Sequence, residues 1–431
     1  MDFIQTYGHF IKKTASANPE RALEMVKLGL FYELNRLKKL PNKKVPKAYQ
    51  KLNQIAVSSI YEALKTPQNS VWTNIFAPVE LLQNFGLNPL SLECFSSFTA
   101  GFRCEDMCID YAEKSGIAET LCSYHKAFIG AGESRILPKP LCSITTSMIC
   151  DGNINTFRYL SSLYQIPLFI LDIPYEYTKD STHYVVTQLN ELIHMLEDLT
   201  HKSFSLNLLK ETLIRENASK AYYQTFLKSQ VGKYYPSSMA LQLFMLFASH
   251  ISIGTQEVLD FYKLLAEDIK KYPKTDVLNI LWVHLMPYQH QVLGSYFNFN
   301  PHYQIQTYDL NLDYMMPMDV SNPLEALAKK MILNLYNGNF ERKVEFVTNL
   351  AKDLNVDAAI NFCHWGCKQS SGAVNLLKEA LAKDEIPMLI LDGDALDHRN
   401  SHDGQIKTRL EAFLEMIEKQ KGGNNDDRLC L

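Results

Sequence analysis

The sequence repeats itself at long range, and this repeat constrains the fold more than any other feature. The run "IPLFILD" at 166–172 returns as "IPMLILD" at 386–392, with five of seven residues identical at an offset of 220 positions. The run "TQLNELIHMLE" from 187 returns as "TRLEAFLEMIE" from 408, at an offset of 221 positions. Each copy is typical of a buried strand followed by an amphipathic helix. The chain is therefore expected to contain two similar α/β halves.

Short apolar runs alternate with helical stretches in both halves, a pattern typical of a parallel sheet covered by helices. We predict an α/β fold with two doubly wound parallel-sheet (Rossmann-like) half-domains and with helical N-terminal and inter-domain segments. The predicted units are a helical N-terminal segment at 1–68, a first α/β half-domain at 69–182, a helical segment at 183–272, a second α/β half-domain at 273–421 and a flexible tail at 422–431.

Composition and hydropathy narrow the class of protein. The 431 residues are 46% apolar and 21% charged with a formal net charge of −4, so we expect no nucleic-acid binding. The longest apolar run, "ALQLFMLFASHISI" at 240–253, is shorter than the roughly 20 residues that span a bilayer, and we interpret it as a core helix. We therefore expect no membrane association. The N-terminus shows no apolar signal segment with a cleavage site, which predicts a cytoplasmic protein.

Nine cysteines in a chain without a secretory signal indicate reduced thiols, which are available for metal or redox chemistry. Two of them lie where the repeat places the end of a strand. Cys150 and Cys367 come 17 and 20 residues before Pro167 and Pro387 of the repeated run. Because open α/β sheets bind ligands outside the carboxyl ends of their strands, two facing halves would bring both thiols to one cleft.

A third thiol, Cys122, begins the helical run "LCSYHKAFIGAG", and Cys367 precedes a helix for which Ser370 and Ser371 are predicted caps. The N-terminus of a helix favours the thiolate, which is the form of cysteine that binds metal. Three thiolates from three distant loops suit a [4Fe-4S] cluster that keeps one iron open to substrate.

Three other interpretations stay open at this point. Each cysteine alone could be a small buried apolar residue. A zinc site could combine two cysteine pairs, or a nucleophilic cysteine could use a histidine as its base. The cysteine pairs are Cys104 with Cys108 and Cys363 with Cys367, and the histidines are His125, His364 and His402.

Together these motifs resemble the 2-hydroxyacyl-CoA dehydratase family of anaerobic bacteria, in the form of the subunits that carry the iron–sulfur cluster. The resemblance extends over residues 70–420. It rests on "APVELLQNFGLNP" with Pro78 and Glu80, on the Cys122 loop, on "ICDGN" with Cys150, and on the C-terminal block "CHWGCKQSSGA…IPMLILDGDALDHRNSHDGQIKTRLEAFLEMIE".

The resemblance implies that Cys122, Cys150 and Cys367 bind a [4Fe-4S] cluster. It implies a lyase of anaerobic metabolism, such as amino-acid fermentation, in which an ATP-dependent iron–sulfur activator protein injects one low-potential electron. The cluster passes the electron to a 2-hydroxyacyl-CoA at the open iron, and the resulting ketyl radical anion expels the hydroxyl group. The implied partner is a second dehydratase subunit or a second copy in a homodimer. The sequence identifies neither a catalytic residue nor the acyl group.

Cys363 and Cys94 depart from the plainest family pattern and leave two related hypotheses open. One is a double-cubane [8Fe-9S] cluster reductase of small molecules, for which Cys363 and Cys94 would be additional ligands. The other is a non-catalytic, cluster-binding accessory subunit. Asp392, Asp394 and Asp397 follow the second copy of the repeated strand, and we interpret them as turn residues.

Overall fold

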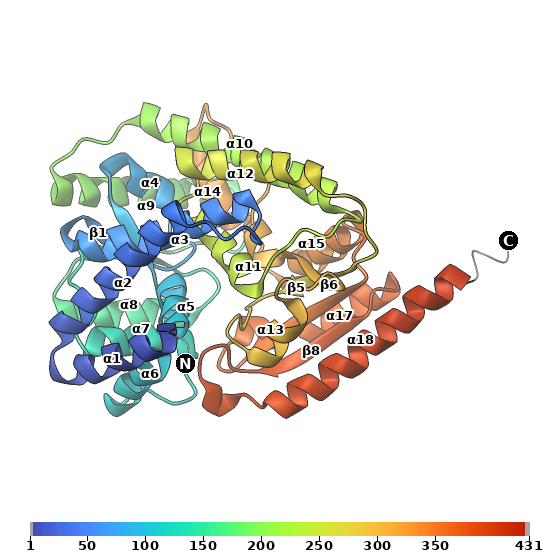
Figure 1. Ribbon diagram of the computed structural model, residues 1–431. Helices are drawn as coiled ribbons and strands as arrows, with labels where there is room; N and C mark the ends of the chain where they lie inside the picture. The colour runs from blue at the N-terminus through green and yellow to red at the C-terminus, as the bar shows by residue number, and fades with distance from the viewer. Residues whose placement is uncertain (1–2, 427–431) are drawn as a thin grey trace.

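The fold is described by a computed structural model that covers residues 3–426 (Figure 1). Within these residues the strands form two four-stranded sheets, with the orders β2-β1-β3-β4 and β6-β5-β7-β8, and every pairing is parallel. Both orders are those of a doubly wound α/β sheet, so the predicted fold class is confirmed. The strands are β1 (Ser70–Thr73), β2 (Asn88–Ser91), β3 (Cys142–Thr146), β4 (Leu168–Leu171), β5 (Leu278–Val283), β6 (Tyr303–Tyr308), β7 (Ala358–His364) and β8 (Met388–Gly393).

The sequence repeat marks equivalent parts of the two sheets. Its first copy spans β4 and its second copy spans most of β8, and each of these is the strand at one edge of its sheet. β4 pairs with β3, and β8 pairs with β7. The helix that follows each edge strand, α9 (Lys179–Thr200) or α18 (Asp403–Asp426), packs against it. The prediction of two similar halves is therefore confirmed at the level of topology.

Further helices complete each half. In the first half they are α4 (Val79–Phe85), α5 (Leu92–Gly101), α6 (Glu105–Lys114), α7 (Ser123–Glu133) and α8 (Asp151–Tyr164). In the second half they are α13 (Gln291–Phe297), α14 (Pro323–Ile332), α15 (Phe340–Asp353), α16 (Lys368–Ser371) and α17 (Val374–Lys383).

The remaining helices pack around and across the two halves. They are α1 (Phe3–Ala17), α2 (Pro19–Lys39), α3 (Lys47–Lys65), α10 (Leu206–Gln230), α11 (Met239–Leu246) and α12 (Gln256–Asp268). α10 contacts α4 of the first half and β6 and α14 of the second, and Figure 1 shows α10 and α12 along the top of the molecule. One continuous hydrophobic cluster contains both Trp72 of β1 and Trp282 of β5, so the halves share a core.

Local sequence explains where some of these helices begin. Asn18 accepts the backbone N–H of Arg21 over 3.0 Å at the start of α2, and Pro19 occupies the first helical position, where a missing N–H costs no hydrogen bond. The apolar run at 240–253 is buried and helical as predicted, in α11 and a π-helical turn at Phe247–Ile251. Across residues 3–426, none of the helices combines the length and the apolar character that crossing a bilayer requires.

Two details differ from the sequence-based expectations. The strand β2 is not predicted, because Pro89 within it cannot donate a hydrogen bond, but β2 lies at the edge of its sheet, where proline is tolerated. The helix α18 continues to Asp426 and so enters the segment predicted as a tail from 422. The rest of that predicted tail, with Cys430, lies outside the described residues.

Candidate functional site

A cavity of about 360 Å³ is lined by residues from both halves at the carboxyl ends of their strands. The segments that follow β1, β3, β5 and β7 all contribute to its wall, through residues such as Phe76, Ser147, His284 and Cys367. In the first sheet the strand order changes direction between β1 and β3, and in the second sheet it changes direction between β5 and β7. Doubly wound sheets bind ligands at this point, so the fold itself marks the cavity as the candidate site.

The three cysteines that the sequence predicts as cluster ligands all line this cavity. Cys122 is the N-cap residue of α7, Cys150 that of α8 and Cys367 that of α16. N–H groups at the start of each helix face the adjacent sulfur and partly oppose the effect of burial on its pKa. The structure thus brings together thiols that are up to 245 residues apart in the sequence.

Burial is the largest influence on the pKa of each of these three thiols. It raises the pKa of Cys122 well above its ordinary value, raises that of Cys150 to about 11, and raises that of Cys367. The neighbouring thiolates add to this, because Cys367 and Cys150 further raise the pKa of Cys122. The three sulfurs are therefore close enough to repel one another when ionised. If all three thiols ionise, they require compensating positive charge, of the kind that metal ions supply to thiolate ligands.

A different buried histidine faces each of the three sulfurs. The distances from histidine Nε2 to cysteine Sγ are 3.2 Å for His364 and Cys122, 3.6 Å for His125 and Cys150, and 3.3 Å for His284 and Cys367. Burial lowers the pKa of all three histidines, to about 4 for His125, so the rings are neutral at physiological pH. His284 is missed by the sequence, because only the fold places the end of β5 next to the end of β7.

The hydrogen bonds of His364 oppose the nucleophilic-cysteine interpretation. The backbone N–H of Ala395 donates to Nδ1 of His364 over 3.0 Å, so the neutral ring carries its proton on Nε2, which faces Cys122. A general base would instead need a free lone pair at Nε2. His402, another histidine of that interpretation, is exposed and does not line the cavity.

The two additional candidate ligands lie away from the cavity wall. The Sγ of Cys363 is 3.4 Å from Asn361 Nδ2 and 3.4 Å from the backbone oxygen of Ser370, and burial raises its pKa to about 11. Cys94 is 4% exposed within α5, and burial raises its pKa far above the ordinary value. In the described part of the chain, three thiols line the cavity and these two do not.

The cysteine pairs of the zinc interpretation are not brought together. Cys104 and Cys108 line a separate apolar cavity with residues such as Ile11 and Phe98. Within residues 3–426, no three His, Cys, Asp or Glu side chains converge closely enough to hold a single metal ion. The three cavity thiols are therefore not arranged to bind a single ion together. In an iron–sulfur cluster each thiolate binds a different iron, and this donor set of three separated thiols fits such a cluster.

The chain after Cys367 differs from the predicted helix start. Ser370 and Ser371 lie inside the short helix α16, where their hydroxyls donate to the carbonyl of Cys367 over 2.9 and 3.0 Å. The Ser370 hydroxyl also accepts the backbone N–H of His364 over 3.0 Å. The two serines therefore fix the turn between β7 and α16 and do not cap α17, which begins without a side-chain cap.

Glu93 of α5 is a cavity residue that the sequence does not single out. The Ser91 hydroxyl donates to its carboxylate over 2.8 Å, and burial raises the pKa of Glu93 to about 7. A carboxyl group with this pKa exchanges a proton near neutral pH, as general acid–base catalysis requires. A glutamate in the first turn of a helix is too common to indicate a site from sequence alone.

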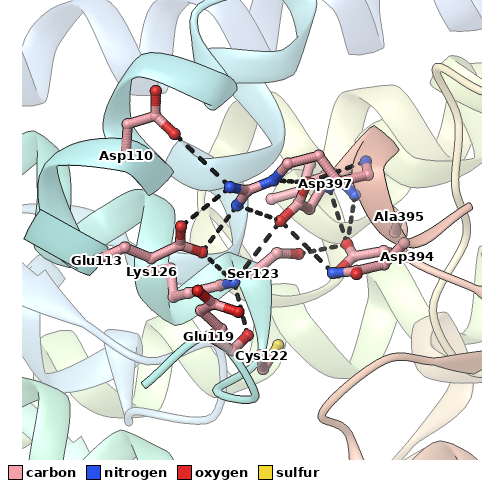
Figure 2. Close-up of polar contacts among 12 residues, drawn as sticks. Asp110, Glu113, Glu119, Cys122, Ser123, Lys126, Asp394, Ala395 and Asp397 are labelled. Atoms are coloured by element: carbon pink, nitrogen blue, oxygen red, sulfur yellow. Dashed lines mark hydrogen bonds and ion pairs between the residues drawn. The ribbon is translucent and has the colours of Figure 1, made fainter. Parts of the chain in front are cut away.

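A polar network joins the two halves beside Cys122 (Figure 2). Lys126 of α7 is 1% exposed, and its Nζ lies 3.6 Å from Oδ2 of Asp397 in the second half. The hydroxyl of Ser123 donates to Asp394 over 2.6 Å. Asp394 also accepts two backbone N–H groups of its own turn. The predicted turn role of Asp394 is therefore confirmed, and the same carboxylate binds the first half next to a candidate ligand.

Comparison with known proteins gives the chain a family. A family model described as 2-hydroxyglutaryl-CoA dehydratase, D-component, matches residues 74–417. The (R)-phenyllactyl-CoA dehydratase alpha subunit of Clostridium sporogenes is 24% identical over 416 residues, which cover 90% of this chain and 99% of the relative. The (R)-2-hydroxyisocaproyl-CoA dehydratase alpha subunit of Clostridioides difficile is 23% identical, and the match covers 83% of this chain and 92% of the relative. The lactoyl-CoA dehydratase alpha subunit of Anaerotignum propionicum is 20% identical, and the match covers 80% of this chain and 90% of the relative. Because the family match extends over most of its length and includes every strand after β1, the chain belongs to the 2-hydroxyglutaryl-CoA dehydratase D-component family.

Proposed function

We propose that this chain is the iron–sulfur component of an ATP-activated 2-hydroxyacyl-CoA dehydratase, in which Cys122, Cys150 and Cys367 hold one [4Fe-4S] cluster. The observation that supports this most directly is that three N-cap thiols line one cavity at the switch points of both sheets. When bound there, the cluster would supply a low-potential electron and one iron with an open coordination position.

The residues of the chain itself would position the substrate and move a proton. Elimination of water from a 2-hydroxyacyl thioester requires a proton for the departing hydroxyl group. Glu93 lines the cavity and has a pKa raised to about 7 by burial, so it is partly protonated near neutral pH. We assign to Glu93 the donation of this proton; the elimination also removes a proton from C3, and the Glu93 carboxylate left behind would accept it, so that the proton balance closes. Apolar wall residues such as Phe76 and Leu92 would exclude bulk water.

The proposed function includes partner proteins. The relatives named above are alpha subunits, which supports a second subunit for this chain as well. An ATP-hydrolysing iron–sulfur activator protein would supply the electron, and the complex would act in the cytoplasm. The placement of Cys363 and Cys94 off the cavity wall supports one cubane rather than a double cubane.

Metal analysis after anaerobic reconstitution tests the cofactor. We expect about four irons and four sulfides per chain, against about eight irons for a double cubane. Alanine substitution of Cys122, Cys150 or Cys367 should remove most of this iron, while Cys363→Ala, the matched control, should retain it. A wild-type protein that stays colourless, or a Cys363→Ala variant that loses half of its iron, would contradict the single-cluster proposal.

Turnover tests the reaction. The reconstituted chain, its second subunit and a reduced ATP-dependent activator should convert a 2-hydroxyacyl-CoA to the 2,3-unsaturated thioester. Glu93→Gln should bind the cluster normally but turn over at least tenfold more slowly, since one acid–base group contributes about 10²–10⁴-fold. A protein that carries the cluster but eliminates no water from any 2-hydroxyacyl-CoA would favour the accessory role instead.

A further inference from the structure

The three cavity thiols share a feature beyond their position, because each faces the Nε2 atom of its own buried histidine. The separations of 3.2, 3.3 and 3.6 Å are hydrogen-bonding distances for a sulfur acceptor. We propose that His364, His284 and His125 are positioning residues that donate N–H···S hydrogen bonds to the three cluster ligands and thereby raise the reduction potential of the cluster. This inference rests on the proposed function, because its acceptors are the proposed ligands.

The geometry is most complete at His364. Its Nδ1 accepts the backbone N–H of Ala395, which leaves Nε2–H as the donor toward Cys122. The side chain is fully buried, and the ring of Tyr124 packs edge-on against it with centroids 5.5 Å apart. His364 belongs to the second half and Cys122 to the first, so this hydrogen bond also joins the halves at the cavity.

His284 is held through its backbone and through the packing of its ring. Its backbone N–H donates to Asp309 over 2.7 Å, and its ring packs on Tyr336, whose hydroxyl donates to the same carboxylate. Its backbone has φ of +66°, a left-handed conformation that costs energy for a residue with a side chain. These contacts direct Nε2 of His284 at Cys367.

The position of His125 next to Cys150 depends on the backbone of Gly152, which passes close to both side chains. Its Nδ1 lies 2.9 Å from the Thr156 hydroxyl, which fixes the ring. A Cβ added at Gly152 would lie 3.0 Å from Nε2 of His125 and 3.1 Å from Sγ of Cys150. Glycine at this position therefore lets the histidine and the thiol approach each other.

The effect on the cluster follows from where the charge goes on reduction. An electron taken from the activator protein increases the negative charge on the ligand sulfurs, and an N–H donor stabilises the more negative state. Hydrogen bonds to sulfur are among the factors that set the potentials of iron–sulfur clusters. Three such bonds would make the cluster easier to reduce by a given donor.

Paired substitutions separate the N–H···S bond from the packing of the ring. In His364→Asn the shorter amide can accept the Ala395 N–H but does not reach Cys122, whereas His364→Gln extends an amide N–H to the position of Nε2. In the same way His284→Asn removes the donor to Cys367 while tolerating the left-handed backbone. His290→Asn is the control, because His290 is a buried histidine that contacts Asp403 and does not line the cavity.

The readout is the midpoint potential of the reconstituted cluster, measured by redox titration followed by EPR, together with the iron content. We expect His364→Asn and His284→Asn to have lower potentials than the wild type, and His364→Gln and His290→Asn to lie close to it. Unchanged potentials in both loss-of-donor variants, with the cluster bound, would overturn the inference and leave the proposed function standing. A wild-type protein that binds no cluster would overturn both.

A measurement on the wild type keeps the test independent of how the variants fold. Pulsed EPR of the reduced cluster in protein labelled with ¹⁵N only in histidine should show nitrogen coupling to the cluster spin. Loss of this coupling in His364→Asn would assign it to that ring. Absence of any histidine coupling in a wild type that carries the cluster would also overturn the inference.

Discussion

At the residue scale, burial governs the chemistry of the cavity wall. It favours the uncharged form of the three cavity thiols and of Glu93, whose pKa it raises to about 7. The same burial keeps the facing histidines neutral. Burial therefore shifts the pKa of each of these thiols, of Glu93 and of the histidines toward the uncharged form.

Glu93 predicts a specific pH dependence of stability. Its pKa is 4.5 in the unfolded chain and about 7 in the folded protein, so the folded state binds more protons between these values. Stability should therefore fall as pH rises from about 4.5 to 7, by at most about 3 kcal/mol from this residue. Glu93→Gln should flatten this part of the curve, measured by urea unfolding of the metal-free protein across that range. An equally steep curve in the variant would contradict the assignment.

A site residue can be predicted from the sequence only where a recognisable pattern lies next to it in the chain. Cys122, Cys150 and Cys367 could be selected because each lies next to a helix start or a repeated strand. Glu93 and His284 could not, because their roles depend on segments that meet only in the folded chain. A buried histidine and a first-turn glutamate have no distinctive local pattern.

At the element scale, the site depends on two loops in direct contact. Gly366, between β7 and α16, has φ of +78°, and a Cβ there would lie 2.7 Å from the backbone oxygen of Thr120 and the nitrogen of Cys122. The Cys367 loop therefore rests on the Cys122 loop with no room for a side chain. The relative position of the two thiols follows from this packing.

Gly366→Ala should separate the loops. A left-handed backbone alone costs about 1–2 kcal/mol for alanine, and the clash should add about 1–3 kcal/mol. Gly116→Ala is the matched control, because Gly116 has φ of +91° but no atom within 4 Å of the added Cβ. Urea unfolding should show the larger loss for Gly366→Ala, and reconstitution should show weaker iron retention in that variant only. Equal losses in both variants would show that the loop contact is not critical.

Element prediction succeeded where the hydrophobic pattern agreed with the local chemistry. The strands of both repeat copies were predicted because apolar runs there end in turn residues, and the folded sheets place them in equivalent positions. The strand β2 was missed because Pro89 is unfavourable in a strand unless that strand lies at an edge. The cap of α17 was predicted wrongly because Ser370 hydrogen-bonds within the preceding turn.

At the scale of the whole molecule, buried charges join segments far apart in the sequence. Lys330 of α14 lies 2.5 Å from Glu80 of α4 and 2.8 Å from Glu216 of α10, and both carboxylates are buried. Glu80, which contributed to the family resemblance, therefore links the first half to the inter-domain helices and to the second half. The ion pair of Lys126 with Asp397 likewise links the first half to the second half, beside the cavity.

Lys330→Met should destabilise the whole molecule by about 3–5 kcal/mol, because it leaves the buried carboxylate of Glu80 without its cation, while Glu216 keeps Lys220 at 2.7 Å. Lys270→Met is the control, since the pair of Lys270 with Glu267 is exposed and should contribute at most about 1 kcal/mol. Thermal unfolding followed by circular dichroism gives the comparison. Similar unfolding temperatures for the two variants would show that the buried network does not hold the halves together.

The distribution of the thiols along the chain also sets the order of events during synthesis. Cys122 and Cys150 leave the ribosome with the first half, and Cys367 follows 245 residues after Cys122. At about 5–20 residues per second, this interval is roughly 10–50 seconds. During that time the first half presents two thiols and His125 without the loop that completes the wall. A cofactor that needs all three thiols would have to be inserted after translation of the second half, because Cys367 is the last of them to be made.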